Sequence, residues 1–162
     1  MGKASRTAFV ITVSDRASSG ERDDASGPGI AARLASLGFT VERATVPDER
    51  APIEAALVAA ASRHDLVVTT GGTGLTPRDV TPQATSAVID YEVPGFAEAM
   101  RADGRASTPM AILSRAVVGV RGQALIVNLP GSPRAALESL AVLEPVLPHA
   151  LETLRGPYEH GG

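Results

Sequence analysis

Short apolar runs alternate with segments of helical spacing along the first half of the chain. The runs 8–13, 39–46 and 65–70 are bounded by polar or breaking residues and predict three strands, of which the first and third are apolar enough to be buried on both faces. Apolar residues at helical spacing lie between these runs, at Ile30, Leu34 and Leu37 and at Ile53, Leu57 and Ala60. This order predicts βαβ units and a parallel sheet covered by helices on both faces.

The second half of the chain predicts further helices and a hairpin. Residues 116–120 and 123–128 are strand-like and are joined by Arg121-Gly122, which predicts a two-residue turn, and residues 102–109 predict a loop. Helices are predicted from Thr81-Pro82 with Thr81 as N-cap, from Pro94 through Met100, from Ser132-Pro133, and through Leu147, Leu151 and Leu154. The tail from Gly156 is predicted to fray. We expect a single domain over residues 1–162, with a core over about 7–155.

Composition narrows the function classes. The net charge of −3 and the scattered Lys and Arg residues argue against a nucleic-acid binder. No apolar run reaches the roughly 18 residues that span a membrane, so we expect no membrane contact. The absence of Cys excludes disulfides, thiolate zinc sites and a Cys nucleophile. The chain enters its first strand without a signal peptide, which predicts a cytoplasmic protein.

A glycine-rich segment follows the third predicted strand. It comprises Thr70, Gly71, Gly72, Thr73 and Gly74. Glycines there let backbone N–H groups approach an anion, and ligands of parallel sheets bind at the carboxyl ends of the strands. The alternative is a turn that only reverses the chain, and the position favours phosphate binding. The segment is neither a Walker A motif nor a Rossmann fingerprint, because no Gly-Lys-Ser/Thr occurs and Pro77 replaces the third glycine.

Two carboxylates are candidates for a metal site at the same edge of the sheet. Asp79 follows the glycine segment, and Asp48 ends the second predicted strand. Together they suit Mg²⁺, which keeps several waters and bridges substrate phosphates. The alternatives are a turn or helix-capping role for Asp79 and a solubilising strand-end charge for Asp48.

Three other features carry weaker signals. The turn at 128–133 places glycine before a helix start, where Ser132 can cap the helix or bind an anion. The polar loop at 14–24 could close over a ligand or remain solvated. The three histidines have no partner at metal-ligand spacing, and no Gly-x-Ser-x-Gly elbow is present.

The chain resembles the molybdopterin-binding domain of bacterial molybdopterin adenylyltransferases, MoaB-type proteins, gephyrin and the plant molybdenum-insertion proteins. The resemblance lies in six segments in the same order, and it covers the chain from about residue 8 to residue 140. They are VSDRASSG (13–20), VPDE (46–49), TTGGTGLTPRDVTPQAT (69–85), PGFAEAMR (94–101), AILSRAVVGVRG (111–122) and ALIVNLPGSPRA (124–135).

The resemblance implies a three-layer α/β sandwich with a mostly parallel central sheet, helices on both faces and a short hairpin. It implies a homotrimer that transfers AMP from Mg-ATP to molybdopterin and releases pyrophosphate, with possible hand-over to a molybdate-insertion protein. The catalytic and metal-binding positions fall on Asp48 and Asp79, and the nucleotide phosphates on residues 70–74. The pterin-binding positions are Ser14, Ser114, Pro130, Gly131 and Ser132, and the candidates for charge stabilisation are Arg16, Arg78 and Arg115.

Two alternatives remain at this point. The first is an inactive MoaB-like pterin-binding protein, because ERDDASGPG (21–29) adds an acidic pattern closer to MoaB. The second is an unrelated nucleotide hydrolase that uses the same glycine segment and Asp pair.

Overall fold

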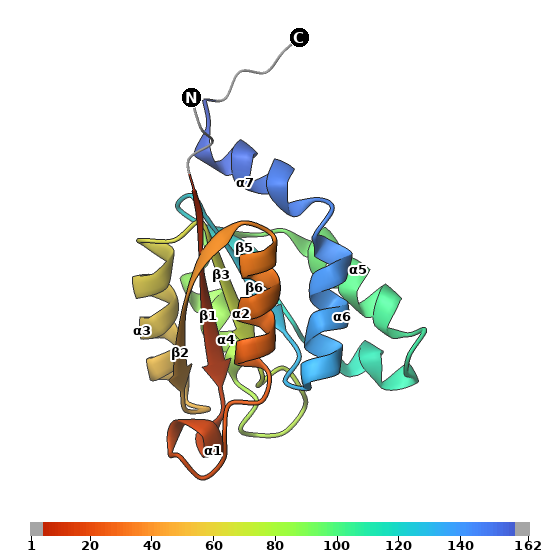
Figure 1. Ribbon diagram of the computed structural model, residues 1–162. Helices are drawn as coiled ribbons and strands as arrows, with labels where there is room; N and C mark the ends of the chain where they lie inside the picture. Colours follow the sequence, from red (N-terminus) through yellow and green to blue (C-terminus); the bar gives the residue numbers. More distant parts are fainter. Residues whose placement is uncertain (1–4, 158–162) are drawn as a thin grey trace.

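A six-stranded sheet organises the chain in the computed structural model, which describes residues 5–157 (Figure 1). The strands are β1 (Arg6–Val13), β2 (Phe39–Val46), β3 (Leu66–Thr70), β4 (Tyr91–Glu92), β5 (Val118–Arg121) and β6 (Ala124–Leu129). The helices are α1 (Asp15–Ser18), α2 (Gly27–Ser36), α3 (Arg50–Ala61), α4 (Thr81–Val88), α5 (Pro94–Gly104), the 3-10 helix η1 (Pro109–Leu113), α6 (Pro133–Leu143) and α7 (Leu147–Arg155).

The predicted parallel sheet and the short hairpin are confirmed. The strand order is β2-β1-β3-β6-β5-β4, in which β1, β2, β3 and β6 run parallel and β5 is antiparallel to β4 and β6. The register aligns Val13 with Val46, and Thr70 with both Thr12 and Leu129. The segments that follow four parallel strands therefore meet at one edge of the sheet.

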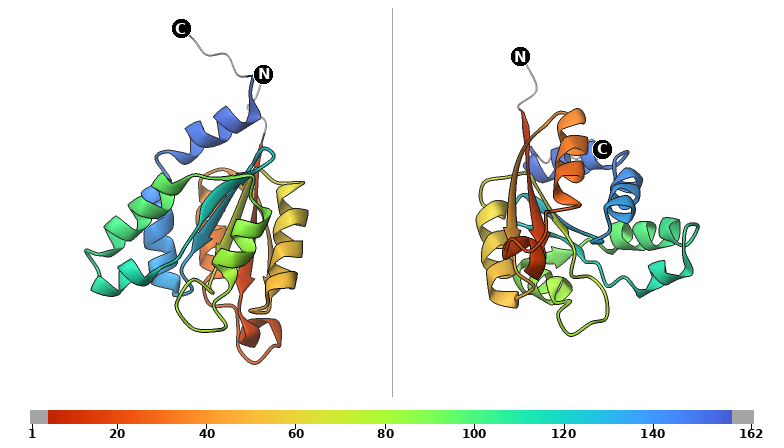
Figure 2. Two further views of the ribbon diagram at one scale, coloured as in Figure 1. Left: turned by 180° about the vertical axis from the view of Figure 1, so that it is seen from behind. Right: turned by 60° about the horizontal axis from the view of Figure 1, so that its bottom comes forward.

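Two helical layers cover the sheet, which confirms the three-layer α/β sandwich. Alternate residues of β1 point to opposite faces, as a strand requires. Ala8 and Val10 lie in a core cluster with α2, α5, α6 and α7, whereas Ile11 and Val13 pack with α3 and α4. The right-hand view of Figure 2 shows α3 on one side of the sheet and α2, α5 and α6 on the other.

Three predicted boundaries were wrong. Helix α5 extends to Gly104, because Arg101, Ala102 and Asp103 continue a helix whose apolar pattern ends at Met100. The following predicted loop contains the start of η1, which Thr108 caps by accepting a hydrogen bond from the main-chain N of Met110. The polar loop at 14–24 begins with the short helix α1, which Ser14 caps through Ala17 N.

The hairpin turn and the start of α4 also differ from their predictions. The turn consists of Gly122 and Gln123, since Arg121 pairs with Ala124, and the φ of +59° at Gly122 explains why glycine stands there. Thr81 is the first residue of α4 rather than its N-cap. Its buried hydroxyl donates instead to the carbonyl of Gly71, so its role is to hold the glycine segment.

The ends of the chain bear on two sequence predictions. Helix α7 ends at Arg155, and the predicted frayed tail lies mostly beyond residue 157, outside the described residues. Within residues 5–157, none of the helices has the length and apolar character needed to cross a bilayer.

Candidate active site

A polar pocket lies at the carboxyl ends of β1, β2 and β3. Its volume is about 250 Å³, and its lining includes Thr12, Ser14, Asp48, Gly71, Gly72, Asp79 and Gly131. In Figure 1 this end of the sheet, with α1 and the loop after β3, is the lower end of the molecule. The structure thus brings together Asp48, Asp79 and the glycine segment, which are separate in the sequence.

Asp48 is held in this pocket by Asp15, which lies just after the end of β1. Its Oδ2 accepts a hydrogen bond of 2.8 Å from Asp15 N, and its own N donates to Asp15 Oδ1 at 2.9 Å. Burial raises the pKa of Asp48, and the neighbouring charges of Asp15 and Asp79 raise it further. A positive charge in the pocket would lower the pKa of Asp48 again, because it favours the ionised carboxylate.

Asp79 lies on the other side of the glycine segment. Its Oδ2 accepts hydrogen bonds from Thr76 N at 2.9 Å and from Thr76 Oγ1 at 2.8 Å. A Cβ atom at Gly74 would come within 2.9 Å of that oxygen, so glycine is needed for the carboxylate to lie against the backbone. The Thr76 bonds fix the side-chain rotamer of Asp79 and leave Oδ1 without a protein donor among residues 5–157.

The glycines of this segment have conformations and neighbours that exclude a side chain. Gly71 and Gly72 have φ values of +99° and +70°. A Cβ atom at Gly71 would collide with the carbonyl of Val13, and one at Gly72 would collide with the Thr81 hydroxyl and lie 3.3 Å from Asp48 Oδ1. Only glycine therefore fits at these two positions, where the backbone passes close to Val13, Thr81 and the Asp48 carboxylate.

The amide groups of the segment differ in whether they are paired. Gly71 N donates to Leu129 O, whereas the amides of Gly72, Thr73 and Gly74 donate to no acceptor within residues 5–157. The hydroxyl of Thr70 is buried between Ser26 and the carbonyl of Pro130 and is therefore committed to the protein. Three consecutive unpaired amides favour anion binding over a turn that only reverses the chain.

Asp48 and Asp79 fit a Mg²⁺ ion but do not form a complete metal cage. Residues 5–157 contain no cluster of three or more His, Cys, Asp and Glu side chains that could hold a metal. Two hard carboxylates in a polar pocket are the donor set that Mg²⁺ uses when phosphates and water complete its coordination. The residues present therefore fit a Mg²⁺ ion whose remaining ligands come from outside the protein.

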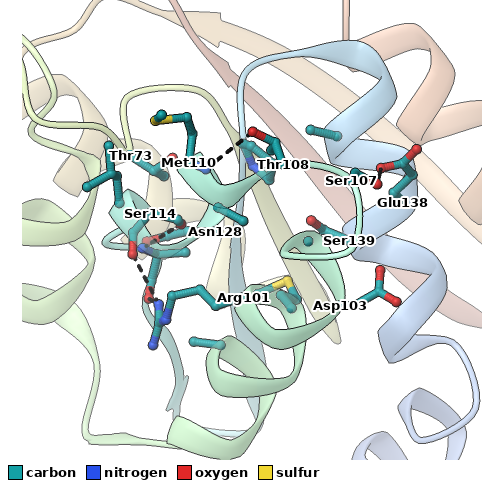
Figure 3. Close-up of a pocket in the computed structure, with 18 of the residues that line it drawn as sticks. Thr73, Arg101, Asp103, Ser107, Thr108, Met110, Ser114, Asn128, Glu138 and Ser139 are labelled. Carbon is teal, nitrogen blue, oxygen red and sulfur yellow. Dashed lines mark hydrogen bonds between the residues drawn. The ribbon is translucent and has the colours of Figure 1, made fainter.

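A second, apolar pocket of about 280 Å³ lies beside the first, between α5, η1 and α6 (Figure 3). Ala97, Met100, Leu113 and Pro130 contribute apolar surface. Figure 3 shows Arg101 reaching toward Ser114 on one side, and Ser139 extending from α6 on the other. The pocket joins an apolar lining to a few polar groups, as small-molecule sites do.

The structure divides the predicted site residues between the two pockets. Thr70, Gly71, Gly72, Ser14 and Gly131 line the polar pocket with the two carboxylates, whereas Thr73, Gly74, Ser114 and Pro130 line the apolar one. Ser132 lines neither of them and caps α6 by accepting a hydrogen bond from Ala135 N. The residues predicted to bind the pterin are therefore not one contiguous set.

The three candidate arginines have different surroundings. Arg78 forms an ion pair with Asp15, with 3.0 Å between Nη2 and Oδ1, at the exposed rim of the polar pocket. Arg16 is exposed on α1. Arg115 instead directs its guanidinium to main-chain carbonyls of the protein, at Gly74 and Asp79. Its donors are thus committed to the loop after β3.

Several residues around the two pockets were not among the predicted site residues. Asp15 follows a predicted strand at the same edge as Asp48, and that position was the signal that could have identified it. The polar lining of the apolar pocket carried no comparable signal, because it lies on helix faces or irregular backbone. These residues are Arg101, Asp103, Ser107, Thr108, Glu138 and Ser139.

Comparisons with known proteins agree with this arrangement. A family described as "Probable molybdopterin binding domain" matches residues 9–149. The molybdopterin adenylyltransferase of Helicobacter pylori J99 is 42% identical over 156 residues, which cover 92% of this chain and 88% of that protein. A molybdenum cofactor biosynthesis bifunctional protein of Synechococcus elongatus is 45% identical across 95% of this chain, which spans only 49% of its length.

A solved structure extends the comparison to the fold. The molybdopterin biosynthesis enzyme MoaB of Thermus thermophilus is 51% identical, with a TM-score of 0.86 over 92% of this chain and 96% of that one. Similarity is therefore high both to a protein named as an adenylyltransferase and to one named MoaB.

Proposed function

The chain belongs to the molybdopterin-binding domain family, and from this premise we propose that it is a molybdopterin adenylyltransferase of molybdenum cofactor biosynthesis. The observation that carries the proposal is the 42% identity to the Helicobacter pylori adenylyltransferase over most of both chains. The pair Asp48 and Asp79 beside unpaired glycine-segment amides supports it, because adenylyl transfer requires charge neutralisation and alignment.

In the proposed reaction, an oxygen of the terminal phosphate of molybdopterin attacks the α-phosphorus of ATP. The new bond joins that oxygen to the α-phosphorus, and the bond from the α-phosphorus to the oxygen bridging to the β-phosphorus breaks. Pyrophosphate leaves with the bridging oxygen. No covalent enzyme intermediate is needed, which agrees with a site that has no Cys and no Lys in its lining.

The residues of the polar pocket have distinct parts in this proposal. Asp48 and Asp79 hold Mg²⁺, and the amides of Gly72, Thr73 and Gly74 donate to nucleotide phosphates. When bound, Mg²⁺ supplies neutralisation of the negative charge on the phosphates. Arg78 at the rim adds a positive charge that Asp15 orients.

The apolar pocket is the proposed place for the pterin ring. Ser114 and Pro130, to which the resemblance assigns pterin binding, line this pocket, and Arg101 and Ser139 add polar groups. Gly131, which lines the polar pocket, follows Pro130 directly. A substrate with its ring in one pocket can therefore present its phosphate to the other.

Three broader parts of the proposal follow from the family. We expect a homotrimer, cytoplasmic location, and hand-over of the product to a molybdate-insertion protein. Sedimentation equilibrium tests the first: a mass near three times the 16.6 kDa chain supports it, and a monomer overturns it.

A MoaB-like protein that binds pterin without turnover is the second candidate. The 51% identity to the Thermus thermophilus MoaB favours it. The two carboxylates favour the enzyme, because a protein that only binds pterin has no need for an Asp pair beside a phosphate site.

The experiment that separates the candidates measures pyrophosphate release with ATP, Mg²⁺ and freshly prepared molybdopterin. Asp79→Asn is the test variant, because Asn keeps an oxygen for the Thr76 bonds while losing the charge. We expect pyrophosphate only when pterin is present, and a loss of about 10²-fold or more in the variant. No pyrophosphate with tight pterin binding indicates the MoaB-like protein, and strong ATP turnover without pterin indicates a hydrolase.

A further inference from the structure

Residues 74–79 form an irregular loop that carries Asp79 into the polar pocket. Leu75, Thr76, Pro77 and Arg78 are exposed, and the segment has neither helix nor strand. The hydrogen bonds inside this 74–79 loop connect Thr76 with Asp79. These bonds orient Asp79 relative to its own loop, but they do not fix the loop relative to Asp48 on the other side of the pocket.

Arg115 holds the 74–79 loop from outside it. Its Nε donates to Gly74 O at 2.8 Å, and its Nη2 donates to Asp79 O at 2.7 Å. One planar guanidinium therefore joins the first and last residues of the loop. Its Nη1 lies 3.3 Å from the side-chain oxygen of Gln83 on α4, and its main-chain N donates to Thr73 O at 3.0 Å.

The backbone that carries Arg115 is itself fixed by a second arginine. Arg101 Nη1 lies 3.4 Å from Ser114 O and 3.2 Å from Ala116 O, the carbonyls on either side of Arg115. Figure 3 shows Arg101 extending from α5 toward Ser114. Ser114 and Ala116 also line the apolar pocket. The wall of the proposed pterin pocket and the loop of Asp79 are thus joined through Arg115.

The other connection of the loop is weaker. Within residues 5–157, its remaining side-chain hydrogen bonds to other elements run from Arg78 to Asp15, and both of these side chains are well exposed. Exposed ion pairs stabilise little, because water competes for both partners. Arg115 is half-buried and donates to main-chain acceptors, so it is the stronger of the two side-chain connections.

We propose that Arg115 is a positioning residue of the adenylyl transfer: it holds the 74–79 loop so that the Asp79 carboxylate faces Asp48 across the polar pocket. The inference rests on the proposed function. It differs from a role in charge stabilisation, because the donors of Arg115 that are described above point to the protein and not into the polar pocket.

Arg115→Lys separates the two roles. Lysine keeps the positive charge but lacks the planar fork that reaches two carbonyls at once. Arg121→Lys is the matched control. Arg121 is the last residue of β5, and its guanidinium also donates to a main-chain carbonyl, that of Val88, at 2.7 Å.

The expected result has a kinetic and a structural part. Arg115→Lys lowers kcat and raises the Mg²⁺ concentration for half-maximal activity, each by about 10–100-fold, while KM for molybdopterin stays within about threefold. Amide hydrogen exchange of a peptide covering 74–80, measured without substrates, becomes about tenfold faster. Arg121→Lys changes none of these quantities.

The kinetic and the hydrogen-exchange measurements also distinguish failure of the positioning role from failure of the proposed function. Near-wild-type kcat in Arg115→Lys, or a loss confined to KM for molybdopterin, overturns the positioning role. If the wild-type protein releases no pyrophosphate, the proposed function fails, and the exchange arm alone decides: faster exchange in Arg115→Lys keeps the loop assignment, and unchanged exchange overturns it.

Discussion

The carboxylates of Asp15 and Asp48 each accept a hydrogen bond from the other residue's main-chain N–H, at 2.9 Å and 2.8 Å. This reciprocal pair joins the segment after β1 to the segment after β2. The pKa values of its two carboxyl groups are shifted in opposite directions. Hydrogen bonding from Arg78 and from Asp48 N lowers the pKa of Asp15, whereas burial and nearby negative charge raise the pKa of Asp48. The pocket therefore holds Asp48 at a cost in stability.

Replacement of Asp48 by Asn tests that cost. Since the folded-state pKa of Asp48 is raised, its favourable contribution is present below the ordinary value of 3.8 and is lost as pH rises through the folded value. At pH 7 without metal, we expect Asp48→Asn to raise Tm by about 1–4 °C. In the assay with Mg²⁺, ATP and molybdopterin, we expect the same variant to abolish pyrophosphate release. The gain should vanish below about pH 4, where the wild-type carboxyl is protonated. Glu98→Gln, an exposed change on α5, is the control, and a lower Tm for Asp48→Asn would contradict the assignment.

The ion pair of Asp65 with Arg155 has the opposite pH dependence. Burial acts to raise the pKa of Asp65, but hydrogen bonds from Arg155 and Thr7 outweigh it, so the pKa is lowered. Its contribution to stability is therefore present above 3.8 and is lost as pH falls through the folded value.

We accordingly expect Asp65→Asn to lower the free energy of unfolding by about 1–3 kcal/mol at pH 7, with a smaller difference near pH 3. Urea unfolding at the two pH values measures both quantities. Glu152→Gln removes a more exposed partner of Arg6 in the same region and should change little. Equal effects of Asp65→Asn at both pH values would show that its charge is not responsible.

Gly38 and Gly71 have nearly the same φ, so alanine substitutions at the two positions separate the cost of backbone strain from the cost of a steric collision of Cβ. Gly38 has a φ of +97° and open space around it, whereas Gly71 has a φ of +99° and faces the Val13 carbonyl. We expect Gly38→Ala to cost about 1–2 kcal/mol and Gly71→Ala about 3–5 kcal/mol, with loss of ATP binding only in the latter. Thermal unfolding and nucleotide titration provide the measurements. Similar costs for both variants would mean that the loop after β3 can shift away from Val13.

Asn128 connects β6 to its neighbours through a fully buried amide. Its Nδ2 donates to Thr69 Oγ1 at 3.0 Å and Thr85 Oγ1 at 2.9 Å, and its Oδ1 accepts from Val117 N at 3.1 Å. Asn128→Leu should cost about 2–4 kcal/mol, because polar groups are left buried without partners.

The triple variant that adds Thr69→Val and Thr85→Val provides the check on Asn128. It removes two of the groups left without partners, so we expect it to recover part of the stability that Asn128→Leu loses. Chemical unfolding of the single and triple variants compares them. A triple variant less stable than the single one would mean that the threonine hydroxyls have other partners in the fold.

The predictable parts of this molecule are those that leave a periodic or positional mark on the chain. Buried strands such as β3 are continuous apolar runs, and Asp48 and Asp79 stand at a strand end and before a helix, so both the sheet and the polar pocket could be anticipated. The role proposed for Arg115 could not be anticipated, because the partners of its Nε and Nη2 are main-chain carbonyls, which every residue offers. The turn at Gly122 was displaced by one residue because apolar patterning fixes a strand better than its ends.

The polar residues of the apolar pocket likewise could not be predicted from the sequence. Arg101 and Ser139 lie on α5 and α6, where their polar character is that of any solvated helix face. Only the packing of these two helices brings them to one cavity. Likewise, the hydroxyl of Thr81 was assigned to a helix cap, whereas tertiary structure directs it to Gly71.

The position of β6 has a consequence for biosynthesis of the chain itself. This strand lies between β3 and β5, yet it is the last strand to be translated among residues 5–157. Until residue 129 has left the ribosome, β3 has an open edge and Gly71 lacks the Leu129 carbonyl that fixes its amide. A nascent chain can thus expose Asp48 and Asp79 without a finished pocket, and the polar pocket is complete only after residue 129 has been synthesised.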